Sequence, residues 1–361
     1  MSQDNIVEFN HVQKSYDGET LVVKDLNLHV ARGEFLTLLG PSGSGKTTVL
    51  MMLAGFEVPT HGEILLNGTP INSVPPHKRG IGMVFQNYAL FPHMTVAENL
   101  RFPLDVRDIS RADAEKKVQT ALEMVRLGQF GNRRPGQLSG GQQQRVAVAR
   151  ALVFDPDLVL MDEPLGALDK NLREEMQLEI KHIHEQLGVS VVYVTHDQSE
   201  ALTMSNRIAV FDDGVIQQLA APDRLYEQPE NAFVAYFIGE NNRLRGTVKS
   251  ANGQACEVDL ENGGGTVKAL PVNVSGEGDK TTLSLRPERV EVNPANSVDN
   301  TFDARVEELI YLGDHIRTRV SVCGNDEFVI KIPNAHGHAR IEKGDTVRVG
   351  WALEDCRALD A

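Results

Sequence analysis

A glycine-rich octapeptide, GPSGSGKT at residues 40–47, restricts this chain to a small set of folds. It fits the pattern G-x-x-x-x-G-K-[ST] at every position. An apolar run at 35–39 precedes it and predicts a buried strand, and residues 48–54 predict a helix that Gly55 ends. Strand, glycine loop and helix in that order are the setting in which this pattern binds a phosphate chain. The sequence therefore predicts that the chain binds a nucleoside triphosphate.

The chemistry of phosphate binding explains the composition of the octapeptide. Several backbone N–H groups must point at the phosphates, and glycines let the backbone approach without a Cβ in the way. The helix start adds free N–H groups and a partial positive charge. We expect Lys46 to reach the β- and γ-phosphates and the Thr47 hydroxyl to hold Mg²⁺. The predicted nucleotide-binding residues here are Gly40, Pro41, Ser42, Gly43, Ser44, Gly45, Lys46, Thr47 and Thr48.

The composition excludes several classes of protein. The length of 361 residues favours two domains, and the formal net charge of −14 argues against a nucleic-acid partner. Cys256, Cys323 and Cys356 have neither metal-ligand spacing nor a disulfide pattern, which favours a reducing compartment. We expect no signal peptide, and no run approaches the ~20 apolar residues of a membrane span. Any membrane role must therefore act through partner chains.

Strand and helix signals divide the first 240 residues. Alternating patterns at 6–12 and 21–30 predict antiparallel strands around a turn. Residues 87–152 change to helical spacing, with capping-box patterns at 95–98 and 110–113, which predicts a helical insert. Outside the insert the pattern is that of an α/β domain. The further elements expected there are strands at 63–66, 81–85, 158–161 and 189–195, a helix at 171–187 and a hairpin at 208–219.

The sequence changes again from about residue 241. Short β-type runs alternate with turn residues such as Asn252-Gly253, which predicts a small all-β barrel or sandwich. We therefore expect two domains, residues 1–240 and 241–361, with a linker near 238–243. The strands expected in the tail are 244–249, 281–285, 302–309, 315–322, 327–332 and 346–351.

Polar residues follow three of the predicted apolar strands. Ligands of open α/β sheets bind at the carboxyl ends of strands. Asp162 is predicted to be a Mg²⁺ ligand through a water molecule, and Glu163 to be the base that polarises the attacking water. His196 is predicted to contact the γ-phosphate or hold that water, and Gln86 to bridge Mg²⁺ and the water. Without the octapeptide, the two acids would be an N-cap and a solvated turn, His196 a polar strand terminus and Gln86 an ordinary exposed glutamine.

A second anion-binding helix start stands at Ser139, Gly140, Gly141 and Gln142, before a helix predicted from Gln143 to Leu152. Because the chain has a single phosphate loop, this second cradle has no nucleotide of its own. The pattern indicates that it closes over a nucleotide held by another copy, in a head-to-tail homodimer with two ATP at the interface. The alternative for Ser139 alone is an ordinary helix N-cap.

These motifs, in this order, resemble the ATP-binding subunits of ABC transporters over about residues 6–237. The motifs are the octapeptide, Gln86, LSGGQQQR at 138–145, LVLMDEP at 158–164 and THD at 195–197. The resemblance implies hydrolysis of ATP with Mg²⁺ by a P-loop NTPase (RecA-like) α/β domain with an antiparallel β subdomain. It implies that Tyr16 stacks on adenine, that Asp169 makes a dimer contact and that Gln86 opens the loop that senses the membrane subunits. Gly166 stands where many relatives have Ser, a departure that we expect to be tolerated.

The stretch FQNYALFPHMTV at 85–96 and the tail with LRPE at 285–288 look like bacterial importers with a TOBE-type, OB-like C-terminal domain. Within that group, VPPHKR at 74–79 looks most like the spermidine/putrescine ATPases. The resemblance implies import of a small solute, with a polyamine first and a sugar or ferric iron as alternatives. It also implies two integral-membrane permease subunits, a periplasmic solute-binding protein as an indirect partner, and a peripheral location on the cytoplasmic face of the inner membrane.

Other interpretations stay open. A non-transport ABC ATPase that acts on DNA or the ribosome is the alternative class, although the long coiled-coil inserts, zinc cysteines or second cassette of such relatives are absent from this sequence. The tail either binds a small-molecule or oxyanion regulator or serves as a homodimerisation module. Residues 286–288 either contact the opposite ATPase domain or form a solvated turn.

Overall fold

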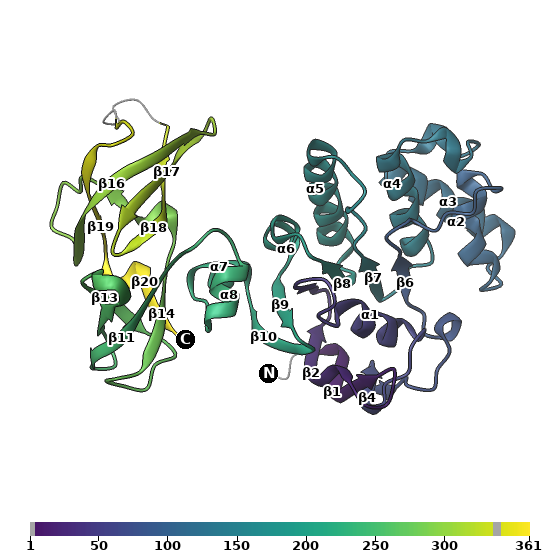
Figure 1. The fold of residues 1–361 in the computed structure, drawn as a ribbon. Coiled ribbons are helices and arrows are strands. Elements are labelled where there is room, and N and C mark those ends of the chain that lie inside the picture. Colours follow the sequence, from purple (N-terminus) through teal and green to yellow (C-terminus); the bar gives the residue numbers. More distant parts are fainter. Residues whose placement is uncertain (1–3, 335–340) are drawn as a thin grey trace. The chain divides into compact units, whose positions relative to one another are not determined.

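The computed structural model describes residues 4–334 and 341–361. They form two compact units, which divide between Leu225 and Tyr226 (Figure 1). From the sequence, the ATP-binding domain is predicted to end at residue 240. That domain boundary stays a prediction.

A six-stranded sheet lies at the centre of the first unit, in the order β10-β9-β3-β8-β7-β6. All neighbours are parallel except β10, which forms an antiparallel hairpin with β9. Strands of a parallel sheet that is covered on both faces are apolar along their whole length. For this reason the strands of this sheet could be recognised as short apolar runs in the sequence. The strands are β3 (Phe35–Leu39), β6 (Gly82–Val84), β7 (Leu158–Asp162), β8 (Ser190–Thr195), β9 (Arg207–Asp212) and β10 (Val215–Ala220).

Successive residues of these strands enter two separate cores, because side chains along a strand point to opposite faces. Phe35 and Tyr193 pack against the helical insert and α5 (Lys170–Leu187). Leu36 and Val192 pack on the other face with α1 (Lys46–Ala54) and a second, antiparallel sheet. Figure 1 shows α5 and α4 on one side of the central sheet and α1 on the other. The central strands are thus fixed from both faces.

The second sheet confirms the predicted antiparallel subdomain. Its strand order is β2-β1-β4-β5. The turn between the first two strands is closed by Asp17, whose carboxylate accepts hydrogen bonds from the backbone N–H groups of Glu19 and Thr20. These hydrogen bonds hold the pKa of Asp17 down at about 2. The strands are β1 (Asn5–Ser15), β2 (Leu21–Ala31), β4 (His61–Leu66) and β5 (Thr69–Pro70).

The helical insert is confirmed, and its caps lie where the sequence predicts them. Thr95 and Glu98 form a reciprocal capping box, and Ser110 accepts a hydrogen bond from the backbone N–H of Asp113. None of the described helices is long and apolar enough to cross a membrane. The remaining helices are α2 (Val96–Asp105), α3 (Arg111–Met124), α4 (Gly140–Leu152), α6 (Gln198–Met204), α7 (Pro222–Glu227) and α8 (Ala232–Phe237).

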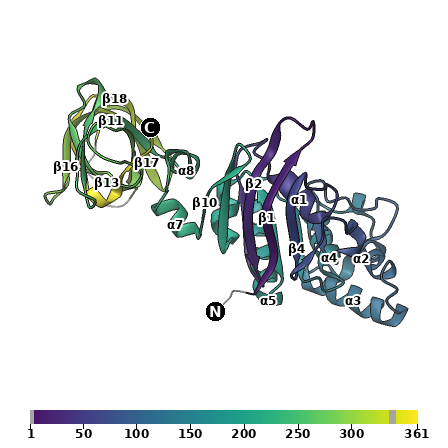
Figure 2. The ribbon, with the colours of Figure 1, turned by 90° about the horizontal axis from the view of Figure 1, so that it is seen from below.

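The second unit contains the predicted β-barrel. The strands β11, β12, β13, β20 and β14 close into a ring, which Figure 2 shows end-on, and the other five form a sheet in the order β15-β19-β16-β17-β18. One core, which includes Trp351 and Phe328, joins both sheets. The strands are β11 (Asn242–Ala251), β12 (Cys256–Leu260), β13 (Thr266–Pro271), β14 (Lys280–Leu285), β15 (Glu291–Val292), β16 (Asn300–Tyr311), β17 (His315–Val322), β18 (Asn325–Pro333), β19 (Thr346–Trp351) and β20 (Cys356–Leu359).

Arg286 joins the short helices α7 and α8 to this barrel. Its side chain is buried, and its guanidinium donates to the backbone carbonyls of Tyr226, Ala235, Ile238 and Glu240. The same group lies 4.2 Å from the centre of the Tyr226 ring. The solvated-turn interpretation is therefore wrong for Arg286, while a contact of residues 286–288 with the opposite ATPase domain stays a prediction.

Replacing Arg286 with Met should lower the free energy of unfolding of the second unit by about 2–4 kcal/mol, because several buried carbonyls would lose their donor. Urea denaturation followed through Trp351, the only tryptophan of the chain, reports on this unit selectively. The control is Arg289→Met, which removes a half-exposed ion pair to Glu227 and should cost less than about 1 kcal/mol. Equal midpoints for the two variants would contradict the prediction.

Candidate nucleotide site

The phosphate loop leaves the carboxyl end of β3 and enters α1. Gly43 and Gly45 have φ angles of 81° and 102°, in the left-handed region that favours glycine. A Cβ on Gly40 would lie 2.2 Å from the carbonyl oxygen of Phe211, so only glycine fits there. Gly45 occupies the N-cap of α1 and supplies no side-chain cap, so the first N–H groups of this helix are left for a ligand. The loop therefore has the geometry of an anion cradle.

Lys46 is buried at the base of this cradle. Its ammonium donates to the carbonyl oxygens of Gly40 and Pro41, at 2.8 and 2.7 Å. Burial lowers the pKa of Lys46, and the negative charges of Glu163 and Asp162 oppose that shift. The ammonium is thus held inside the loop, at the place where a phosphate chain would bring further negative charge.

The predicted metal ligands meet beside the loop. Thr47 Oγ1 donates to Asp162 Oδ1 at 3.4 Å, so the start of α1 and the end of β7 are in contact. Burial, and secondarily the charge of Glu163, raise the pKa of Asp162, while Thr47 and Lys46 oppose the shift. A hydroxyl and a carboxylate are hard oxygen donors of the kind that Mg²⁺ prefers, usually together with waters and substrate phosphates. These residues therefore fit the magnesium ion that the sequence implies.

Glu163, His196 and Gln86 converge at the same edge of the sheet. Glu163 Oε1 lies 3.1 Å from His196 Nδ1, and Gln86 Nε2 donates to Glu163 Oε2 at 3.4 Å. Glu163 itself has a φ of 44°, an uncommon value for a residue with a side chain, and its N–H donates to the carbonyl of Val194 in β8. We call Lys46, Thr47, Gln86, Asp162, Glu163 and His196 the strand-end cluster.

Tyr16 lies at the rim of the phosphate loop. The residue is 59% exposed, and its hydroxyl is 3.3 Å from Thr48 Oγ1 in the first turn of α1. The ammonium of Lys14 lies 4.8 Å from the ring centre and is itself fixed by Glu57 and the carbonyl of Val58. The structure thus brings the predicted adenine-stacking ring next to the predicted phosphate site.

The segment Ser139–Gln142 forms a reciprocal capping box, with Ser139 as the N-cap of α4. The helix therefore starts at Gly140, earlier than the predicted Gln143. Among the described residues, the side-chain hydrogen bonds recorded for Ser139 and Gln142 stay within this segment and do not reach the strand-end cluster. Asp169, the predicted dimer contact, caps α5 through a hydrogen bond from the N–H of Leu172. Both proposed partner-facing residues are exposed at helix starts.

Gly166 lies beside the cluster, and a Cβ there would be 3.5 Å from the carbonyl oxygen of Glu163, an ordinary contact. Glu200 is a cluster neighbour that the sequence analysis missed: its buried carboxylate accepts hydrogen bonds from Tyr193 and Thr195, next to His196. The spacing Asp197–Glu200 is that of a capping box and was the available signal. That signal would have predicted a helix start, not a buried carboxylate.

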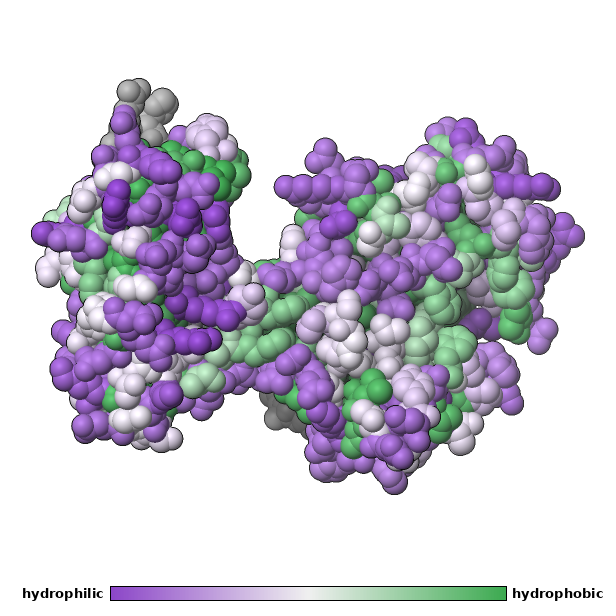
Figure 3. Space-filling view, viewed as in Figure 1, coloured by the Kyte–Doolittle hydropathy of each residue, from purple (hydrophilic) through white to green (hydrophobic). Residues whose placement is uncertain are grey.

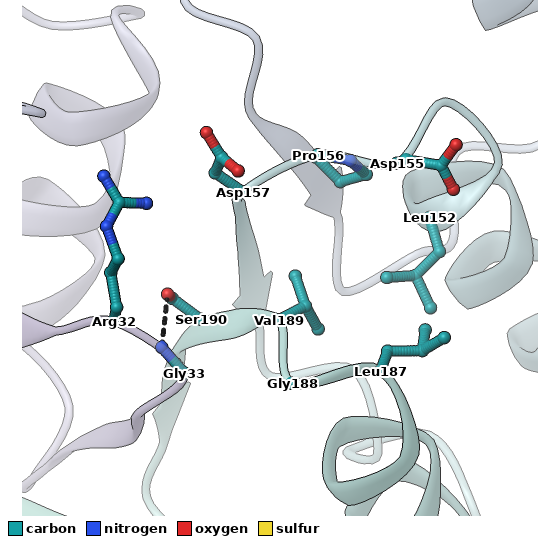
Figure 4. A pocket seen from close by; sticks show the side chains of 10 residues that line it. All are labelled: Arg32, Gly33, Leu152, Asp155, Pro156, Asp157, Leu187, Gly188, Val189 and Ser190. Carbon is teal, nitrogen blue, oxygen red and sulfur yellow. Dashed lines mark hydrogen bonds between the residues drawn. The ribbon is translucent and has the colours of Figure 1, made fainter.

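A cavity of about 280 Å³ lies at the opposite edge of the central sheet, where β7 and β8 begin (Figure 4). Ser190 Oγ accepts a hydrogen bond from the N–H of Gly33 there, at 3.0 Å. None of the predicted nucleotide residues lines this cavity. Because ligands of open α/β sheets bind at the carboxyl ends of strands, the strand-end cluster is the stronger candidate for the functional site.

Comparison with known families gives two matches. The ABC transporter profile matches residues 23–166, which include the phosphate loop, Gln86, Ser139 and the acids at the end of β7. The TOBE domain profile matches residues 283–359, within the second unit.

Relatives of similar length extend the match to nearly the whole chain. The chain is 46% identical over 354 residues to "Spermidine/putrescine import ATP-binding protein PotA 2" of Pseudomonas aeruginosa, covering 97% of each protein. It is 47% identical to the PotA protein of Chromobacterium violaceum, covering 97% of this chain and 98% of the relative. Among solved structures, the dimeric post-hydrolysis state of the ATP-binding cassette MJ0796 bound to ADP and Pi is 37% identical, with a TM-score of 0.54, and covers 60% of this chain and 98% of that one.

Proposed function

This chain belongs to the ATP-binding subunits of ABC transporters, and on that premise we propose that it powers the uptake of a polyamine such as spermidine or putrescine. As a member of this family it is an ATP-hydrolysing transporter subunit. The observation that supports the solute is the similarity over nearly the full length to relatives named as spermidine/putrescine import proteins. Neither of the two relatives reported above is named for a sugar or ferric iron, the alternative solutes.

In the proposed mechanism, the chain's own residues position the reactants and stabilise charge. The loop N–H groups and Lys46 bind the phosphates, and Thr47 and Asp162, with Gln86, would hold Mg²⁺, which neutralises phosphate charge when bound. The Glu163 carboxylate accepts a proton from the attacking water, while His196, 3.1 Å from it, orients that carboxylate. Tyr16 stacks on the adenine ring.

The proposed active form is a homodimer in which each nucleotide is held between two copies. One copy supplies the strand-end cluster, and the other supplies Ser139, Gly140, Gly141 and Gln142. Support comes from the exposed start of α4, where, among the described residues, the side-chain hydrogen bonds of Ser139 and Gln142 stay within 139–142. A 37% identical relative whose structure is described as dimeric with ADP and Pi also supports it. Asp169 would contact the partner copy at the exposed start of α5.

We propose that the permease subunits dock on the helical insert. A groove of about 370 Å³ reaches Phe85, the residue before Gln86, and further apolar residues such as Phe91, Phe102, Val106 and Phe154 line it. Phe102 and Val106 are 41% and 56% exposed. Figure 3 shows apolar surface, in green, over the insert at the right of the view. An apolar groove next to Gln86 suits a segment of a membrane subunit, which would place the chain peripherally on the cytoplasmic face of the inner membrane.

The test is reconstitution of the full chain with two candidate permeases and a candidate solute-binding protein from the same organism. Proteoliposomes should take up labelled spermidine or putrescine only with internal MgATP, and the solute-loaded binding protein should stimulate ATP hydrolysis. Glucose and ferric citrate serve as comparison solutes. Stimulation by one of these solutes, without any by a polyamine, would overturn the proposed solute but not the ATPase role.

A further inference from the structure

The loop that carries His196 is fixed by a buried carboxylate. Tyr193 and Thr195, at the end of β8, each donate a hydroxyl hydrogen bond of 2.7 Å to Glu200 Oε2. All three of these residues are at most 2% exposed. The N–H of Asp197 donates to Thr195 Oγ1 at 3.0 Å, and Asp197 caps α6. The backbone on both sides of His196 is therefore held, while the imidazole itself is half exposed and reaches Glu163.

Arg173, on α5, contacts this loop and a second loop at once. One terminal nitrogen donates to Asp197 Oδ2 at 3.0 Å, and the other donates to the carbonyl oxygen of Leu168 at 3.0 Å. Its Nε lies 3.9 Å from Glu200 Oε1. Because a guanidinium is planar and its donors have a fixed geometry, it sets the distance between the two loops as a rigid spacer. A lysine ammonium cannot reproduce that geometry.

The second loop ends at Asp169. This residue directly follows Leu168 and caps α5, and its carbonyl accepts a hydrogen bond from the backbone N–H of Arg173. The first turn of α5 thus carries both the exposed carboxylate of Asp169 and the base of the Arg173 side chain. A shift of Asp169 would move the carbonyl that Arg173 binds, and through Arg173 the loop after His196.

We propose that Arg173 is a positioning residue that couples the contact of Asp169 with a second copy of this chain to the orientation of His196 beside Glu163. The inference rests on the proposed homodimer. It says how formation of the dimer would control the rate of ATP hydrolysis. In this proposal, a correctly bound partner copy fixes Asp169. The carbonyls of Asp169 and Leu168 accept hydrogen bonds from the backbone and side chain of Arg173 and so fix its position. Arg173 in turn fixes the loop after His196 through Asp197. Arg173 touches neither substrate nor reacting atoms, so its effect should appear in turnover and not in nucleotide affinity.

The test compares Arg173→Met with Arg173→Lys in the full chain, with MgATP as substrate. Arg173→Met should lower kcat about 10- to 100-fold, as expected for a misplaced catalytic group, while the KM for ATP stays within about twofold. The kcat of Arg173→Lys should regain less than half of what Arg173→Met loses relative to the native chain. The matched control is Arg207→Met, because Arg207 also bridges a carboxylate, Glu34, and a backbone carbonyl, that of His29, beside the start of β3. The kcat of Arg207→Met should stay within about twofold of the native value.

Two further measurements separate this inference from the dimer on which it rests. If Arg173 and Asp169 act through one path, Arg173→Met combined with Asp169→Ala should lose no more activity than the worse single variant. Losses that multiply, or an Arg173→Met chain with native kcat, would overturn the coupling. The dimer is judged separately, by whether Glu163→Gln forms a dimer in ATP: if it does not, the proposed dimer fails, whatever Arg173 does.

Discussion

Glu163→Gln should bind ATP normally and fail to turn it over. The substitution keeps the side-chain volume and one oxygen beside His196 but removes the negative charge that accepts a proton. We expect kcat to fall at least about 100-fold, the range typical of a lost general base, with the affinity for ATP within about threefold of native. We further propose that hydrolysis reopens the dimer, so the variant should remain dimeric in ATP, which light scattering after size exclusion can measure.

Asp157→Asn is the matched control for this experiment. Asp157 stands before the first residue of β7, as Glu163 stands after the last, so both variants neutralise one acid at an end of the same strand. Asp157 is exposed and lines the cavity at the opposite edge of the sheet. Its variant should keep kcat within about twofold. Near-normal turnover by Glu163→Gln would remove Glu163 from the role of base.

The strand-end cluster was predictable from the sequence because its parts are local. The phosphate loop is contiguous, and Gln86, Asp162 and His196 each follow a short apolar run. Parallel strands bring their carboxyl ends to one edge, so separate runs could be assigned to one site before any contact was known. Family resemblance added only Tyr16 and Asp169, for which the local sequence offers no chemical signal.

Contacts between distant segments could not be predicted in this way. Arg173 lies in α5 and Asp197 is the N-cap of α6, and neither residue type indicates its partner. Arg286 belongs to a recognised motif, yet its role as a donor to buried carbonyls depends on how α7 and α8 fold back. The short strand β20 closes the barrel by pairing with both β13 and β14, and four residues with little alternation gave no indication of it.

Helix starts show a related limit of sequence-based prediction. The sequence predicts a first helical residue at Gln143, after two glycines, and glycine is generally unfavourable inside helices. The capping box between Ser139 and Gln142 supplies donors and acceptors for the first turn, so the helix begins at Gly140. A Cβ on Gly141 would lie 3.0 Å from the Leu172 side chain, so a larger residue there would have to displace Leu172 slightly. The capping box occupies the N–H of Gln142. The N–H groups of Gly140 and Gly141, at the start of the helix, have no intrahelical partner, so we propose that they face an anion from outside the chain.

Ser139→Arg should abolish turnover by blocking the partner's nucleotide, although the substituted residue lies outside the strand-end cluster proposed to bind ATP in its own chain. We expect kcat to fall at least about 100-fold, comparable to the loss of a transition-state donor, with unchanged ATP binding by the monomer. In the Glu163→Gln background the substitution should also prevent the ATP-dependent dimer.

Ser110→Arg separates this effect from the loss of a helix cap. Ser110 is likewise an exposed serine that caps a helix of the insert, α3, through the N–H of Asp113. Either substitution should cost about 0.5–2 kcal/mol of stability through the lost cap. Only Ser139→Arg should lose turnover, since only the start of α4 is proposed to face a second nucleotide. If Ser139→Arg keeps both the ATP-dependent dimer and its activity, the nucleotide is not shared between copies, and the phosphate loop with its strand-end cluster must be a complete site in one chain.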